Sequence, residues 1–167
     1  MVRTRKVIII FSLIFILFLL GGPVGAQDDS NLPQVYLTTD PDNLFDYYRG
    51  IYTPGFHFDQ WRKENPDLSL IYQNHAANYN MKGKDWEREA HVAFYEPDGT
   101  LAFAQNIGIR IHGGWTRTYD RKSLRLYARK EYDEASSIKY DVFPGLTKRD
   151  GTPLQEFKRL ILRNSGN

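Results

Sequence analysis

The chain has 167 residues, with 22 Lys and Arg against 20 Asp and Glu and a formal net charge of +2 at pH 7. All charges before residue 27 are positive, so the remainder carries 19 Lys and Arg against 20 acids, and global charge gives no argument for nucleic-acid binding. The sequence contains no Cys, which excludes disulfides, so core packing must stabilise the fold. The length beyond residue 26 suits one domain rather than two.

Residues 1–26 have the pattern of an export signal. Cationic residues precede an apolar run from Val7 to Leu20, which is shorter than the roughly 20 residues of a membrane span. Small residues from Val24 to Ala26 suit a signal peptidase, so we predict cleavage after Ala26. The mature protein would then be secreted or at the cell surface without a stable membrane anchor; an uncleaved N-terminal anchor is the alternative. We expect residues 27–33 to be a disordered leader and residues 34–167 to form the domain.

The first elements of the domain are short. Gln34 to Thr39 alternates apolar and polar residues, which predicts a strand. Asp40 followed by Pro41 is typical of a helix N-cap and first helical residue, so we expect one helical turn as far as Asp46.

A polar and aromatic region follows. Phe45 to Trp61 is rich in aromatic residues and is interrupted by Gly and Pro, so we predict an irregular loop. Its aromatics are either a satellite core against the sheet or a surface on which sugars or bases stack. Asn65 to Lys84 is polar and reads as a surface connection. The His residues in these loops have no partner at ligand spacing, so we assign no metal.

Antiparallel strands dominate from Trp86 onward. Alternation from Trp86 to Phe94, the turn at Glu96–Thr100 and alternation from Leu101 to Ile111 predict a hairpin with one buried face. A further ladder contains Leu124, Leu126 and Ala128. The apolar run within Phe157–Arg163 is typical of a strand covered on both faces. We therefore predict an α+β fold that is mainly an antiparallel sheet of four to six strands, forming one lobe of a larger protein.

The loop between the last two ladders carries the candidate chemistry. Side chains alternate along a strand, so Lys122 shares the apolar face of Leu124 and Leu126, where a cation is costly unless it meets an anion. Gly113 and Gly114 permit a backbone turn of the kind that cradles phosphate. No standard phosphate-binding motif is present, and a solvated hairpin with a snorkelling Lys122 is an equal alternative.

Several ordered motifs resemble the kinase family typified by spore coat protein H (CotH). They are G-I-R-I-H-G-G-W-T-R-T-Y-D-R-K-S-L-R-L-Y, then I-K-Y-D-V-F-P-G, then F-K-R-L-I-L-R-N-S-G-N, preceded by L-P-Q-V-Y-L-T-T-D-P-D-N-L-F-D and R-G-I-Y-T-P-G. The resemblance implies the N-terminal part of an atypical, secreted protein-kinase-like fold. It implies binding of ATP with Mg²⁺ or another divalent metal, and phosphorylation of Ser in a protein substrate on the cell or spore surface. By the family pattern, Lys122 would contact the nucleotide phosphates, with Arg110 and Arg117 nearby.

The family pattern continues past the point where this sequence stops, at Asn167. Its catalytic and metal-binding acids lie in that continuation, and phosphoryl transfer needs such acids. We therefore expect no catalytic residue and no phosphotransferase activity in this truncated chain, while the full-length parent would be a kinase. The alternative hypothesis is a non-enzymatic cell-surface module that binds carbohydrate or protein through the Phe45–Trp61 aromatics. A complete β-sandwich carbohydrate module is a third reading.

Overall fold

The computed structural model describes residues 7–11, 32–71 and 75–164, and an antiparallel sheet dominates it. The strand order is β1-β2-β3-β4-β5-β8. These strands are β1 (Val7–Phe11), β2 (Gln34–Thr39), β3 (Arg88–Tyr95), β4 (Leu101–His112), β5 (Ser123–Tyr127) and β8 (Arg159–Leu162). A separate two-stranded sheet pairs β6 (Ile138–Lys139) with β7 (Glu156–Phe157). The prediction of an α+β fold built mainly on antiparallel strands is confirmed.

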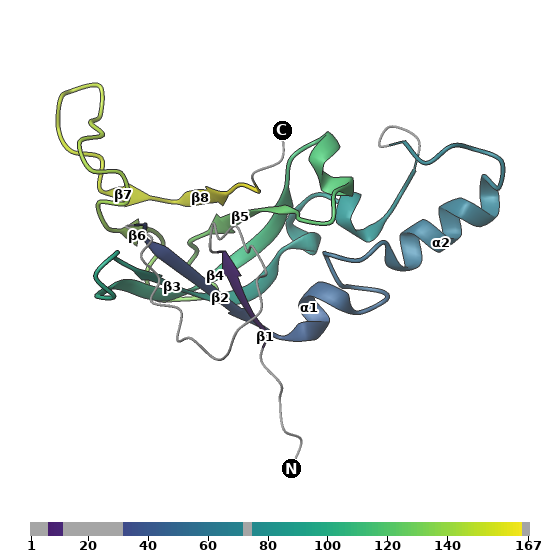
Figure 1. The fold of residues 1–167 in the computed structure, drawn as a ribbon, viewed down its shortest axis with the longest axis horizontal. Helices are drawn as coiled ribbons and strands as arrows, with labels where there is room; N and C mark the ends of the chain where they lie inside the picture. Colours follow the sequence, from purple (N-terminus) through teal and green to yellow (C-terminus); the bar gives the residue numbers. More distant parts are fainter. Residues whose placement is uncertain (1–6, 12–31, 72–74, 165–167) are drawn as a thin grey trace, which may run out of the picture.

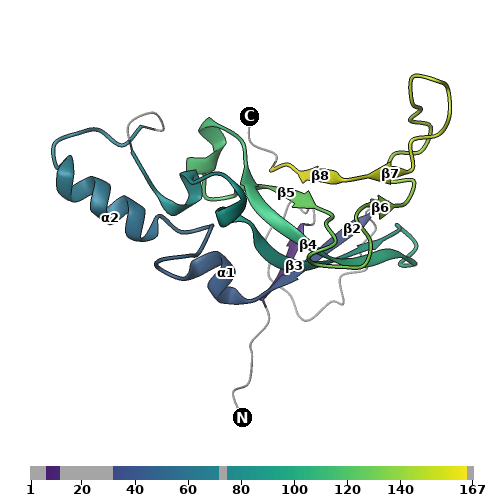
Figure 2. The ribbon, with the colours of Figure 1, turned by 180° about the vertical axis from the view of Figure 1, so that it is seen from behind.

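The helices gather at one end of the sheet. Helices α1 (Pro41–Phe45) and α2 (Gly55–Glu64) lie there, and the loop between β6 and β7 extends from the other end (Figures 1 and 2). The described connections contain three short 3-10 helices, namely η1 (Asn78–Asn80), η2 (Lys84–Trp86) and η3 (Trp115–Thr118). Helix α1 begins as predicted, because the Asp40 carboxylate accepts a 2.9 Å hydrogen bond from the Asp42 backbone N–H.

One face of the sheet forms the core. Alternate positions of β2, β3, β4 and β5 point their side chains to this face, as the sequence alternation predicts. Leu44 of α1 and the following Ile51 cover it. The buried strand residues are Leu37, Ala90, Val92, Ile107, Ile109, Ile111, Leu124 and Leu126.

The predicted irregular loop was wrong over Gly55–Trp61, which belongs to α2. The sequence of α2 lacks the apolar stripe that marks an amphipathic helix, and the helix accordingly buries few of its side chains. Its aromatics instead contact one another and a neighbouring loop: the ring centroids of Phe58 and Trp61 lie 6.3 Å apart, and those of Phe58 and His75 lie 6.0 Å apart.

The expectation that the last strand is covered on both faces was also wrong. Among the strands that the structure describes, β8 pairs with β5 alone and lies at an edge of the main sheet. Ile161 is 44% exposed, and Leu160 and Leu162 are only half-buried. The apolar run reflects one packed face at this edge rather than two.

Most of the predicted export signal lies outside the described residues. Within it, Val7–Phe11 forms β1, which pairs with β2 so that Ile9 is opposite Leu37. In the part of the chain that the structure describes, no helix is long and apolar enough to cross a membrane.

Candidate functional site

The connection between β4 and β5 builds the candidate site, and it begins with a residue that must be glycine. Gly113 has φ of +112°, and a Cβ there would collide with the Thr116 hydroxyl. Gly114 has a negative φ and open space where a Cβ would lie, so its lack of a side chain is not required by packing. The chain then turns through η3 and enters β5.

Lys122 lies on the core face, as its parity with Leu124 predicts. Only 4% of it is exposed. Its Nζ donates a 2.7 Å hydrogen bond to the Tyr119 carbonyl and lies 4.3 Å from the centroid of the Tyr79 ring and 5.4 Å from that of Tyr52. The Lys122 backbone N–H donates to the Tyr52 hydroxyl at 2.8 Å. Two aromatic rings and one carbonyl therefore surround the amine.

The charge of this amine is not neutralised by an ion pair among the described residues. Burial lowers the pKa of Lys122 from 10.5 to about 8, while the nearby charge of Asp120 acts in the opposite direction. Cation–π contacts with tyrosine compensate part of the lost hydration. A desolvated cation of this kind is stabilised by any anion that reaches it.

Arg117 has a structural role that the sequence did not suggest. It is 7% exposed, and its guanidinium donates to four backbone carbonyls. These carbonyls belong to Gly113 (2.7 Å), Tyr79 (2.8 Å), Met81 (3.2 Å) and Ile111 (2.7 Å). The N–H groups that a phosphate would need are thus used to join the loop around η1 to the end of β4.

Arg110 lies on the opposite face of the sheet from Lys122. Arg110 is the cross-strand partner of Arg125, and the next pair along the two strands is the buried Ile111 and Leu124. Cross-strand partners share a face, and successive residues alternate. The structure therefore separates two cations that the sequence placed together.

Glu87 is the charged residue that sequence reasoning missed. Its side chain is fully buried and lies within ion-pair distance of Lys84 (2.8 Å), Arg129 (2.9 Å) and Arg110 (3.3 Å). A Cβ at position 108 would collide with this carboxylate, so the glycine that lies against it is the sequence signal. Buried carboxylates with several cationic partners hold an arrangement in place, and Glu87 thereby fixes Arg110 on its face.

Other features of the described residues lie away from Lys122. Two surface cavities of about 610 Å³ and 340 Å³ flank the small β6–β7 sheet, and Lys122 lines neither. Within the described residues, no group of three or more His, Cys, Asp or Glu side chains could hold a metal ion. Phe45, Tyr47 and Tyr48 are exposed aromatic residues at the end of α1 and just after it; Tyr48 is 66% exposed and its ring centroid lies 4.9 Å from that of Tyr47.

The geometry thus assigns the predicted residues three separate roles. Lys122 is a buried amine without an ion pair in the described chain, Arg117 binds backbone carbonyls, and Arg110 lies on the far face. Comparisons of the chain with protein-family models, with curated proteins and with solved structures found no match.

Proposed function

We propose that this chain is the nucleotide-binding, N-terminal part of an exported CotH-like protein kinase, in which Lys122 contacts the ATP phosphates. The observation that supports this most directly is the nearly buried Lys122 amine, whose pKa is lowered to about 8. A phosphate oxygen is an anionic acceptor, which this amine does not have among the described residues, and the attraction between them would be strong in a poorly solvated site. Phosphorylation of a protein Ser belongs to the full-length parent in this proposal.

The described residues fit a phosphate better than they fit its metal. Lys122 supplies a charge-assisted donor, and the left-handed Gly113 lets the preceding backbone turn sharply. The divalent metal that accompanies ATP receives no ligand from these residues in the proposal, and no step is derived through it.

Calorimetric titration of the purified chain with ATP, with and without Mg²⁺, tests the proposal. The Lys122→Met variant removes the charge but keeps an unbranched apolar side chain, and Lys130→Met is the matched control because Lys130 is exposed. We expect saturable ATP binding in the wild type and the control and a loss of about tenfold or more in affinity in Lys122→Met. Equal affinity in all three proteins would refute the proposal.

A second candidate function is a carbohydrate-binding surface module. The exposed group of Phe45, Tyr47 and Tyr48 favours it, because aromatic faces open to solvent can stack on sugar rings. Glycan binding that is lost in Tyr48→Ala, with no effect of ATP on the protein, would support this function instead.

A further inference from the structure

We infer that the face of β4, β5 and β8 opposite Lys122 is a separate binding surface for a chain of phosphate groups. The cross-strand register places cations from three strands on this face. Arg110 of β4 is opposite Arg125 of β5, which is opposite Ile161 of β8. His112 and Arg159 occupy the flanking positions of the same face, and Arg163 follows at the end of β8.

Two of the cations at the β5–β8 edge are not balanced by acids in the described part of the chain. Arg125 and Arg159 form no salt bridge there, and Glu87 pairs with Arg110 from the side of β3. The exposed Glu89 is opposite Gly108, at the other end of the face from His112. A net positive potential therefore remains around His112.

The contacts of His112 are consistent with this excess of positive charge. Arg125 Nη2 lies 2.8 Å from His112 Nδ1 and can only donate, so the imidazole accepts and is neutral. Burial, followed by the charges of Arg125, Arg117 and Arg163, lowers the pKa of His112. The charges that lower this pKa belong to arginines, and an anion between Arg125 and Arg163 would relieve their repulsion.

The buried Tyr127 ring and Glu87 carboxylate lie under part of the surface and hold its arginines in place. The guanidinium carbons of Arg110, Arg129 and Arg159 lie 4.1, 4.9 and 5.7 Å from the centroid of the Tyr127 ring, which is nearly buried. Glu87 binds the first two of these cations from beneath Gly108. Guanidinium groups held by a ring and a carboxylate lose less conformational entropy when a ligand binds.

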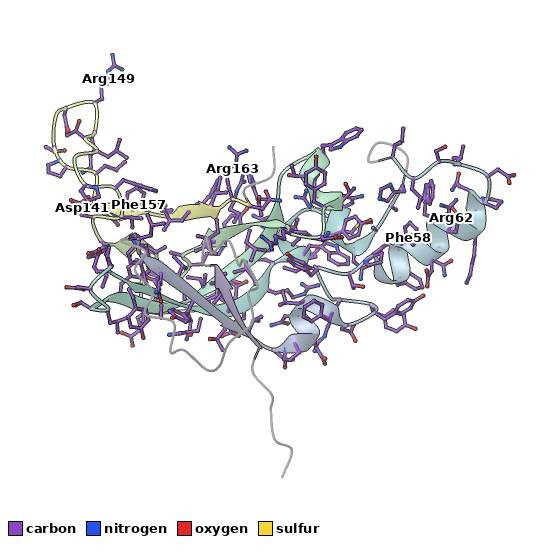
Figure 3. The ribbon with its side chains drawn as sticks, in the orientation of Figure 1. Phe58, Arg62, Asp141, Arg149, Phe157 and Arg163 are labelled. Carbon is purple, nitrogen blue, oxygen red and sulfur yellow. The ribbon has the colours of Figure 1, made fainter. Side chains whose placement is uncertain are left out.

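The dimensions and exposure of the surface favour several phosphate groups over one. Three strands span about 10 Å, and positions two residues apart along a strand span about 7 Å. Arg159 and Arg163 are exposed, and Figure 3 shows Arg163 projecting outward from the sheet. Arginine forks suit phosphate oxygens because they bind them through paired N–H groups. The ligand class is a polyphosphate chain, either free or as part of a nucleotide.

Titration with sodium tripolyphosphate at low ionic strength tests the inference, with ATP as a second arm. We expect Arg125→Gln and Arg163→Gln each to weaken tripolyphosphate binding by about tenfold or more. Arg149→Gln is the matched control, since Arg149 lies at the tip of the exposed loop at the other end of the sheet (Figure 3). Equal affinities for ATP and tripolyphosphate in the wild type would identify the phosphate chain alone as the ligand, and tighter binding of ATP through the same arginines would identify a nucleotide.

The test separates this surface from the site of the proposed function. Lys122→Met should leave the tripolyphosphate-induced shift of the His112 ring signals unchanged, whereas it should weaken ATP binding if the proposed function is correct. In the wild-type protein, tripolyphosphate should shift the NMR signals of the His112 ring but not those of His57. This measurement needs no variant. Absence of binding, unaltered binding in both arginine variants, or loss in Lys122→Met alone would overturn the inference.

Discussion

Raising the pH above neutral should stabilise the fold, because it discharges Lys122 inside the protein. The pKa of this amine is about 8 in the folded chain against an ordinary value of 10.5. Between these values the unfolded chain binds more protons than the folded chain, so the free energy of unfolding rises with pH in this window. Below about pH 8 the folded protein carries the full cost of the buried charge.

The magnitude follows from the size of the pKa difference. One pKa unit corresponds to about 1.36 kcal/mol, so the full effect is about 3 kcal/mol. Between pH 7 and about pH 9.5, the contribution of this group to the free energy of unfolding rises by about 2 kcal/mol. For a domain of this size, that gain corresponds to an increase of roughly 6 °C in Tm.

Urea unfolding at these two pH values measures the effect, and comparison with Lys122→Met isolates it from other titrating groups. We expect the free energy of unfolding to rise by about 2 kcal/mol more in the wild type than in Lys122→Met. Lys130→Met should keep the wild-type pH dependence, because Lys130 is exposed. The same pH dependence in the wild type and Lys122→Met would show that the amine is solvated and would refute the reasoning.

Three further predictions follow from the same structure. Gly108→Ala should lower the free energy of unfolding in urea by about 1–3 kcal/mol, because the new Cβ collides with the buried Glu87 carboxylate. Gly114→Ala is the control, since a Cβ there has room and should change this free energy little. Equal losses in the two variants would contradict this account. Arg117→Lys should lower the free energy of unfolding by about 3 kcal/mol, since one ammonium cannot serve four carbonyls, and an unaltered denaturation curve would refute that role. In an NMR titration the pKa of His112 should lie below 6.5 and should rise in Arg125→Gln while burial still keeps it low; a pKa that the substitution leaves unchanged would show that Arg125 does not act on the ring.

Local patterns in the sequence predicted the elements that obey them. Strand β2 and the β3–β4 hairpin follow from alternation and from turn residues, and the Asp40 cap follows from its own chemistry. Helix α2 was missed because its aromatic residues contact other rings instead of forming one buried stripe. The edge position of β8 was missed because the number of apolar residues in a strand does not show how many strands pair with it.

For the candidate site, the sequence by itself determined that Lys122 shares a face with Leu124 and Leu126, because side chains alternate along any strand. Only the tertiary structure decided that Arg110 lies on the other face and that Arg117 binds carbonyls of a distant loop. Which residues meet across strands depends on register and on long-range packing, and neither is encoded in the spacing of cations along one segment. The same register collects the arginines of β4, β5 and β8 into one surface, although Arg110 and Arg159 lie far apart in the sequence.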